Sequence, residues 1–511
     1  MSAFRRTLPP RPNLEQQKKL AKDLLGAFRS GDAEALARIR AELPDKKDVA
    51  LADAQFVLAR EYGFASWRDL KQHIDDSAVD QLPLSDRFKQ AVHARDAAAL
   101  RRMRSHRQEL RAIINEPLFD FDSPAIVATS SDIEMVDALL DLGADPNRRS
   151  DWWAGAFHAL YGAPPAVAER LIAAGAVPDA CAAAHMDQID LLAAMIAADP
   201  SRVHERGGDG QTPLHFARSR EVVDLLLDAG ADINARDVDH RSTAAEWMLG
   251  AAADPKQSRL AIAKYLVERG AATDIFLAAA TGDTARALAL LTASPELLEL
   301  RTGQGQYGEQ PPSSFHIYLW TIGANFTPLQ AAARFRQRET LEAMRPFASP
   351  QQRLLFACHE GQGDEVRAII ASHPGIIDGL TGDDRRALTD EAWMGNVKAV
   401  EVMMELGFDP GARSVSGPTG GTALHCAAWQ GSVGSVAAIL RYERGRALIQ
   451  IQDSTFHGTP LGWCLHGSRN CGDPRADHAE VARQLLAAGA VVTSQMTEAS
   501  DEVMAVIHPS G

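Results

Sequence analysis

The sequence predicts an all-α fold, a solenoid of about twelve short helix pairs stacked in a row behind a helical N-terminal cap. Three observations lead to this prediction. Helix-start signals recur along the chain, glycines that end helices recur with a spacing near 32 residues (Gly143 to Gly175), and the residues between them follow the apolar period of a helix. Each such unit buries its apolar face only against its neighbours, so an array is expected.

The N-terminal region is expected to shield the first repeat. Residues 1–13 are proline-rich and basic, which predicts disorder, and residues 14–78 have helical apolar spacing, which predicts the cap. Within the cap, residues 59–67 read AREYGFASW. Phe64 and Trp67 are expected to cover the end of the solenoid, because a solenoid end must be shielded. Docking of a partner on these two rings is the alternative.

The clearest repeat lies at residues 209–240. Thr212 and Pro213 begin one helix, because a capping hydroxyl followed by a proline suits a first helical turn. A second helix follows and ends at Gly230, since glycine tolerates the left-handed conformation there. The stretch TPLHFA from residue 212 and the stretch GADIN from residue 230 resemble the two most recognisable segments of the ankyrin repeat.

Similar signals mark further units along the chain. Starts recur at Thr327, Thr422 and Thr459, and ends recur at Gly143, Gly175, Gly270, Gly407 and Gly489. Residues 59–67 also resemble a leader found ahead of many bacterial ankyrin arrays. The chain is therefore similar to bacterial ankyrin repeat proteins. This resemblance implies recognition of a protein or peptide partner, without catalysis, by turns and by the concave face of the first helices.

The expected organisation has six parts. They are a disordered N-terminus (1–13), the helical cap (14–78), a first block of ankyrin repeats (79–301), an insertion loop (302–326), a second block of repeats (327–496) and a C-terminal tail (497–511). The insertion is much longer than usual repeat connections, and long connections in compact folds tend to be functional or disordered. It is a candidate lid over a groove on residues 334–467.

Composition excludes several classes of function. A formal net charge of −14, without a basic stripe, argues against binding to nucleic acid or anionic lipid. No stretch reaches the roughly 18 apolar residues of a membrane span. The pair Arg5-Arg6 is followed by prolines, so a twin-arginine signal is not expected. Five scattered cysteines suit reduced thiols, which predicts a cytoplasmic protein.

The face expected to bind the partner is rich in rings. Two positions just before each mid-repeat glycine should point into the concave side, where a purely solvated face would carry small or charged residues. The candidate binding residues are His185, Arg334, Phe335, His359, Glu360, Trp393, Met394, Trp429, Gln430, Trp463 and His466, with His316 and Trp320 from the insertion. Rigid aromatic side chains supply a large contact area at low entropic cost, which favours binding over repeat packing alone.

An enzyme acting on a small polar or glycan-like molecule in the same groove is the alternative. Glu391 falls where the repeat normally has a small residue, and Glu246 falls where it has a histidine. A buried carboxyl group with a raised pKa suits general acid catalysis, so Glu246, Asp390 and Glu391 are the candidate catalytic residues of a hydrolase or lyase. Tryptophans 393, 429 and 463 would form a stacking floor. The competing interpretation is that these carboxylates bridge adjacent turns.

Other chemistry has weaker support. In the ankyrin motif, the histidines corresponding to His215 and His425 are structural, and they hydrogen-bond to loops of neighbouring repeats. No nucleophile elbow and no glycine-rich phosphate loop is present, so no cofactor is predicted. Cys464 and Cys471, with His457, His466 and His478 nearby, have residue types that suit zinc but lack its short Cys-x-x-Cys spacing, so no metal is predicted. A purely structural spacer is the third possibility.

Overall fold

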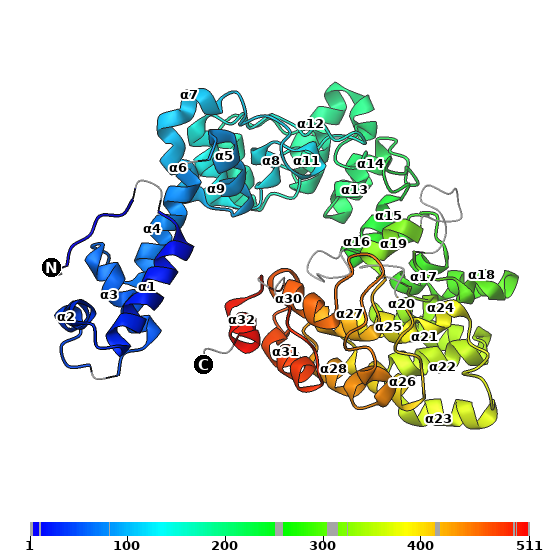
Figure 1. Cartoon of the computed structure of the whole chain (residues 1–511). Coiled ribbons are helices and arrows are strands. Elements are labelled where there is room, and N and C mark those ends of the chain that lie inside the picture. The colour runs from blue at the N-terminus through cyan, green and yellow to red at the C-terminus, as the bar shows by residue number, and fades with distance from the viewer. Residues whose placement is uncertain are drawn as a thin grey trace. The chain divides into compact units, whose positions relative to one another are not determined.

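The computed structural model describes residues 4–9, 12–46, 48–80, 82–250, 259–303, 315–323, 325–413, 420–493, 496 and 498–508. In this part of the chain every regular element is a helix, and β pairing is limited to three isolated bridges in turns (Figure 1). The all-α fold expected from the sequence is confirmed. The helices are short because each crosses only one repeat before a turn reverses the chain.

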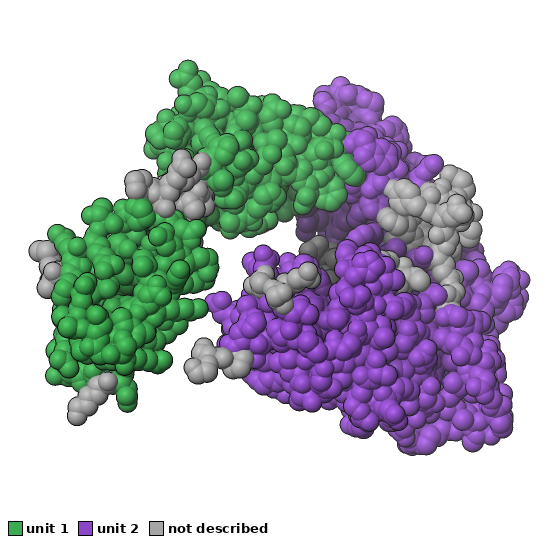
Figure 2. All heavy atoms as spheres, viewed as in Figure 1, with its two compact units in different colours: residues 1–152, 157–177 green, residues 153–156, 178–511 purple. Residues whose placement is uncertain are grey.

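The chain forms two compact units (Figure 2). Unit 1 contains residues 1–152 and 157–177, and unit 2 contains residues 153–156 and 178–511. The division at residue 177 lies inside the segment 79–301, which the sequence assigns to one block of repeats.

Unit 1 begins with four helices that form their own small cores. Its helices are α1 (Leu14–Arg29), α2 (Ala33–Glu42), α3 (Leu51–Glu61), α4 (Trp67–Asp80), α5 (Leu84–His93), α6 (Ala97–Arg102), η1 (Met103–His106), α7 (Arg107–Leu110), η2 (Asp120–Asp122), α8 (Ala125–Ala128), α9 (Ile133–Leu142) and α10 (Pro165–Ala173). Phe64 and Trp67 pack against the core formed by Ala59, Leu70 and Ile74.

The described part of the N-terminal segment, for which the sequence predicts disorder, contacts helix α3. The backbone N–H of Arg6 donates to the carbonyl oxygen of Glu61 at 2.8 Å, and Leu8 packs against the core of Ala59, Leu70 and Ile74. Glu61 is fully buried, and its carboxylate accepts two hydrogen bonds of 2.8 Å from Arg38. Residues 1–3, 10 and 11 lie outside the described part of the chain.

Unit 2 is a succession of helix pairs. Its α-helices are α11 (Ala180–His185), α12 (Ile189–Ala198), α13 (Pro213–Phe216), α14 (Arg220–Asp228), α15 (Ala244–Trp247), α16 (Leu260–Glu268), α17 (Ile275–Thr281), α18 (Thr284–Ala293), α19 (Phe315–Thr321), α20 (Pro328–Arg334), α21 (Arg338–Met344), α22 (Pro350–His359), α23 (Gly363–Ser372), α24 (Gly382–Arg385), α25 (Ala387–Trp393), α26 (Val397–Glu405), α27 (Ala423–Trp429), α28 (Val433–Leu440), α29 (Glu443–Arg446), α30 (Pro460–Asn470), α31 (His478–Ala487) and α32 (Asp501–Ile507). Short 3-10 turns are η3 (Pro200–His204), η5 (Pro295–Glu299) and η6 (Arg345–Phe347).

The first helices of successive pairs lie side by side, as α11 does with α13, α25 with α27, and α27 with α30. Their facing positions are small: α11 reads ACAAAH, and its first five residues are fully buried. Small side chains let helix axes approach closely, and the larger apolar residues of the second helices fill the space behind them. In the clearest repeat, Gly230 follows α14 with φ +95°, which is the left-handed helix end expected there.

Two segments outside the regular repeats also enter the core of unit 2. In the insertion, α19 buries Tyr318 against Phe276, with ring centroids 5.4 Å apart, and residues 304–314 lie outside the described part of the chain. In the segment that the sequence assigns to a C-terminal tail, α32 buries Val503 and Ile507 in the last core cluster. These segments extend the solenoid's core beyond the recognisable repeats.

Candidate functional site

Three consecutive first helices each place one ring in a continuous row. Trp393 ends α25, Trp429 ends α27, and His466 lies in α30. The two indoles stack with centroids 6.1 Å apart and an interplanar angle of 29°, and the His466 ring lies 5.0 Å from Trp429. Trp393 and Trp429 are half-buried, whereas His466 and the neighbouring Met394 are exposed. We call Trp393, Trp429 and His466 the aromatic row.

The row forms because the repeat places equivalent positions of adjacent helices next to one another. Trp393, Trp429 and Gln430 are each half-buried, and His466 and Met394 are exposed, so the row and its neighbours remain partly accessible. Partly exposed aromatic side chains in a group are costly for solubility and favourable for binding.

Four other candidate binding residues differ in their exposure and in their contacts. Phe335 is half-buried, and the Arg334 guanidinium lies 5.7 Å from the centroid of the Phe326 ring. His359 contacts that same ring edge-on at 5.7 Å, while Glu360 is exposed. This second group of rings and charges involves α20 and α22 and the residues that close the insertion.

Three other candidates, His185, Trp320 and His316, lie outside the aromatic row. His185 lies beside Arg218, and burial, with the charge of Arg218, lowers the pKa of His185 to about 4. Trp320 is 60% exposed on α19, and the side chain of His316 lies outside what the structure describes.

The structure buries Trp463, a residue of α30, against the preceding loop and not on an open face. It is 6% exposed, and its indole Nε1 donates to Asp453 at 2.9 Å. The Trp247 indole makes the equivalent bond to Asp237. These tryptophans therefore anchor turns, and Trp463 presents little surface to a ligand.

The buried carboxyl group of Glu246 has a structural role. Its Oε2 accepts the backbone N–H of Thr243 at 2.7 Å and so caps the start of α15. At the equivalent position of α13, Nδ1 of His215 accepts the backbone N–H of Thr212 at 3.1 Å. Burial, together with the charge of Asp274, raises the pKa of Glu246 to about 8. The raised pKa follows from placing a carboxyl group in a fully buried capping position.

The two motif histidines behave as the resemblance implies. In each, Nδ1 caps its own helix and Nε2 bonds a carbonyl oxygen of the next turn: His215 to Ser242 and His425 to Gly458, both at 3.1 Å. Burial lowers the pKa of both imidazoles to about 4, although the backbone hydrogen bonds act to raise it. They are neutral links between repeats.

Asp390 and Glu391 belong to a separate polar cluster. Asp390 accepts a 2.6 Å hydrogen bond from Asn325, and burial raises its pKa to about 7 despite that bond. Glu391 lies 2.7 Å from His359 Nδ1 and accepts a 2.7 Å bond from Asn396. Burial alone would lower the pKa of His359, but the charge and hydrogen bond of Glu391 outweigh it, so the pKa is raised.

The cavity beside this cluster is small. It is lined by Asn325, Phe326, Asp390, Glu391 and Met394, among others, and has a volume of about 20 Å³. That volume holds about one water molecule, whereas small-molecule sites usually measure about 300–1,000 Å³. Glu246 does not line this cavity. The three carboxyl groups therefore do not form one catalytic constellation around it.

Cys464 and Cys471, whose residue type would suit zinc, both have hydrogen-bond partners. The Cys464 thiol donates to the carbonyl oxygen of His478 at 3.3 Å, and Cys471 lies 3.5 Å from Gln430 Oε1. Burial raises the pKa of Cys464 to about 12, so it remains a thiol at neutral pH.

A larger pocket in unit 1 was not expected from the sequence. It measures about 390 Å³ and is lined by His93, Phe119, Phe121, Phe157, His158 and Tyr161, among others. Phe121 and Asp122 both have left-handed backbones, with φ +58° and +49°, and the Phe121 side chain is 54% exposed. Strained backbone of this kind concentrates at functional sites. The only sequence signal was the density of aromatic residues between 119 and 161.

Comparisons with known proteins identify one repeat. The ankyrin repeat family model matches residues 209–238, the segment that carries the clearest motif. Among solved structures, the chain is similar to the ankyrin repeat domain of human ASB11, with 16% sequence identity, a TM-score of 0.22, and coverage of 62% of this chain and 100% of that chain. No curated protein matches the chain. In the described residues, no helix combines the length and apolar character needed to cross a membrane.

Proposed function

We propose that this protein binds a protein or peptide partner through the aromatic row of Trp393, Trp429 and His466. Ankyrin repeats generally mediate protein–protein interactions, and residues 209–238 match that family model. The single observation that supports the position of the interface is the stacking of partly exposed rings across three consecutive helices. We place this binding face on the concave side of the repeats, as the resemblance implies.

The rings provide what an interface centre requires. Tryptophan loses little conformational entropy on binding, and two stacked indoles are already held in place by one another. Met394 adds an adaptable apolar contact beside them, since its thioether side chain adjusts to an irregular surface. A bacterial, cytoplasmic adaptor is the role that we propose, and the five free thiols are compatible with a reducing compartment.

An enzyme acting on a small polar or glycan-like substrate is the less favoured candidate. It rests on Glu246, Asp390 and Glu391, of which Glu246 caps a helix and Glu391 is bonded to His359 and Asn396. The 20 Å³ cavity beside Asp390 does not accommodate a sugar ring.

Site-specific photo-crosslinking tests the proposed interface. A photoreactive amino acid in place of Met394 should crosslink a partner in cells, whereas the same group in place of Phe456, which is 70% exposed in a turn, should not. His466→Glu should reduce the crosslink at position 394 without altering the thermal unfolding curve, because His466 is exposed. Equal crosslinking at both positions, or no response to His466→Glu, would overturn the proposal.

A further inference from the structure

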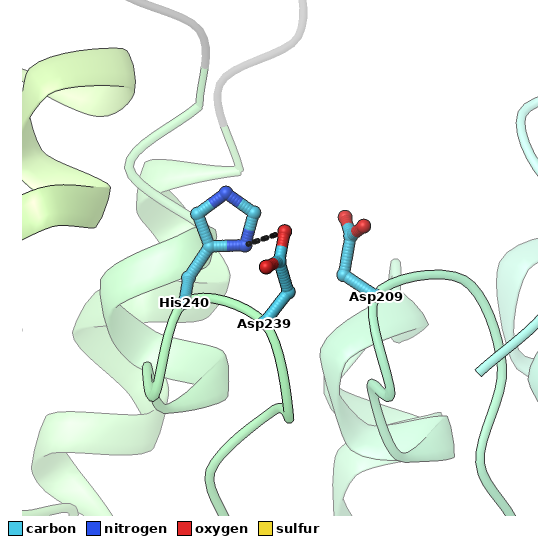
Figure 3. A group of neighbouring side chains, drawn as sticks. All are labelled: Asp209, Asp239 and His240. Carbon is cyan, nitrogen blue, oxygen red and sulfur yellow. Dashed lines mark ion pairs between the residues drawn. The ribbon is translucent and has the colours of Figure 1, made fainter. Parts of the chain in front are cut away.

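Two turns that precede successive repeats bring three potential metal ligands together (Figure 3). Asp209 lies in the turn before α13, and Asp239 and His240 lie in the turn before α15. Their side chains project from the two turns toward the same side. One oxygen from each carboxylate and one ring nitrogen all lie within 4.8 Å of one another.

The backbones of the two turns are fixed against each other. The N–H groups of Val238 and Asp239 both donate to the carbonyl oxygen of Asp209, at 3.0 and 3.1 Å. Gly210 has φ +79°, and a Cβ atom at this position would overlap the Val238 side chain. The close approach therefore requires glycine here. The donors are carried on a rigid support, which is a general requirement for a metal site.

The separations suit a chelated ion. Ligands about 2.1 Å from a metal stand about 3.4 Å apart in a tetrahedral arrangement. Nδ1 of His240 and Oδ2 of Asp239 are 3.6 Å apart, which is close to that value. All three ligand atoms lie within 4.8 Å of one another, which exceeds the tetrahedral separation by at most about 1.4 Å, so a side-chain rotation of Asp209 would bring its oxygen into place.

The surroundings of the three side chains also favour a bound cation. Asp209 is only 8% exposed, and it faces a second carboxylate across the turns. Like charges at this distance repel, and a divalent cation between them reverses the interaction. The His240 ring is held edge-on against Trp247, with centroids 4.9 Å apart and an interplanar angle of 78°, which restricts its orientation.

We propose that Asp209, Asp239 and His240 bind one divalent transition-metal ion, with water in the remaining positions. A set of one imidazole and two carboxylates suits Zn²⁺, Mn²⁺ or Co²⁺ and is unlike the all-oxygen sets of Ca²⁺. The ion crosslinks two successive turns and so stabilises the repeat that matches the ankyrin model. This site is independent of the partner interface.

The test uses the full-length protein after treatment with a chelator. Titration with Zn²⁺ followed by calorimetry should show one saturable site per chain, and Zn²⁺ should raise the unfolding temperature. Asp239→Asn and His240→Gln should each weaken the affinity by about tenfold or more, which is the scale of the effect of losing a metal-site partner. His373→Gln, which alters an exposed histidine elsewhere, should leave both measurements unchanged.

A spectroscopic measurement distinguishes this site from adventitious binding. Co²⁺ bound by the wild type should give visible absorption bands that disappear in the His240→Gln variant. Absence of saturable binding, or equal binding by the wild type and both variants, overturns the proposal. Should either variant unfold without metal, Asp209→Asn, which preserves side-chain size, provides the same comparison. Binding of Ca²⁺ in preference to Zn²⁺ would also refute a role for the imidazole.

Discussion

Replacing Glu246 with glutamine should stabilise the protein in a pH-dependent manner. Glu246 is 3% exposed, and burial, reinforced by the charge of Asp274, raises its pKa from 4.5 to about 8. Between these values the folded chain retains a proton that the unfolded chain releases. The stability of the wild type therefore falls as the pH rises from about 4.5 to about 8, and glutamine does not titrate.

The magnitude follows from the pKa difference. Each pH unit above 4.5 costs the wild type about 1.4 kcal/mol, so at pH 7 the variant should gain up to about 3 kcal/mol. Below pH 4 the difference should vanish. Glutamine keeps the capping bond, because Gln330 accepts the N–H of Thr327 at 2.9 Å in the equivalent position of another repeat.

Urea denaturation of the wild type and Glu246→Gln at pH 4, 5.5 and 7 measures the effect. The reciprocal variant Gln330→Glu is the matched control, and it should introduce a pH-dependent loss of stability where none existed. A Glu246→Gln variant that is less stable than the wild type at pH 7 would refute the reasoning. In that case Glu246 would be ionised and stabilised by Arg236, whose guanidinium lies 3.9 Å away.

Three further substitutions test other parts of unit 2. Arg241→Gly should stabilise by about 1 kcal/mol in urea denaturation, because Arg241 has φ +57° in a turn where glycine is unstrained. His359→Ala should cost about 3 kcal/mol at pH 6, since it leaves the buried Glu391 carboxylate without its charged partner. The raised pKa of His359 means that this cost should decline as the pH rises above that pKa, which a pH series of the same denaturation detects. Gly445→Ala should lower stability by about 2 kcal/mol, because a Cβ atom there would overlap the Ile439 carbonyl oxygen, whereas Gly26→Ala, with open space around it, should not destabilise.

The sequence predicts the fold well because each helix of a repeat has local signals. The threonine and proline before α13, the apolar face of α14 and the glycine after it are all close together in the chain, so no long-range pairing had to be inferred. The two added segments, α19 and α32, were harder to predict. Tyr318 and Ile507 belong to no repeat motif, and their burial depends on neighbours far away in the sequence.

The candidate site is less predictable than the fold. The repeat register places Trp393, Trp429 and His466 in adjacent positions, so their proximity follows from the sequence. The indole of Trp463 differs, because its orientation is determined by a hydrogen bond to Asp453 that the repeat motif does not encode. The contact between Asp209 and Asp239 likewise depends on the conformations of two turns, which spacing alone does not specify.

The contrast between Glu246 and Trp429 shows which departures from a repeat motif carry functional information. Position 246 requires only a side chain that accepts the N–H of the capping residue, and histidine, glutamine and glutamate all do so in this chain. An unusual residue there is explained by the fold. The end of a first helix has no such capping requirement at position 429, where the side chain is half-buried. A ring there, stacked on another ring from the preceding repeat and only partly buried against the core, is therefore the stronger indication of a binding surface.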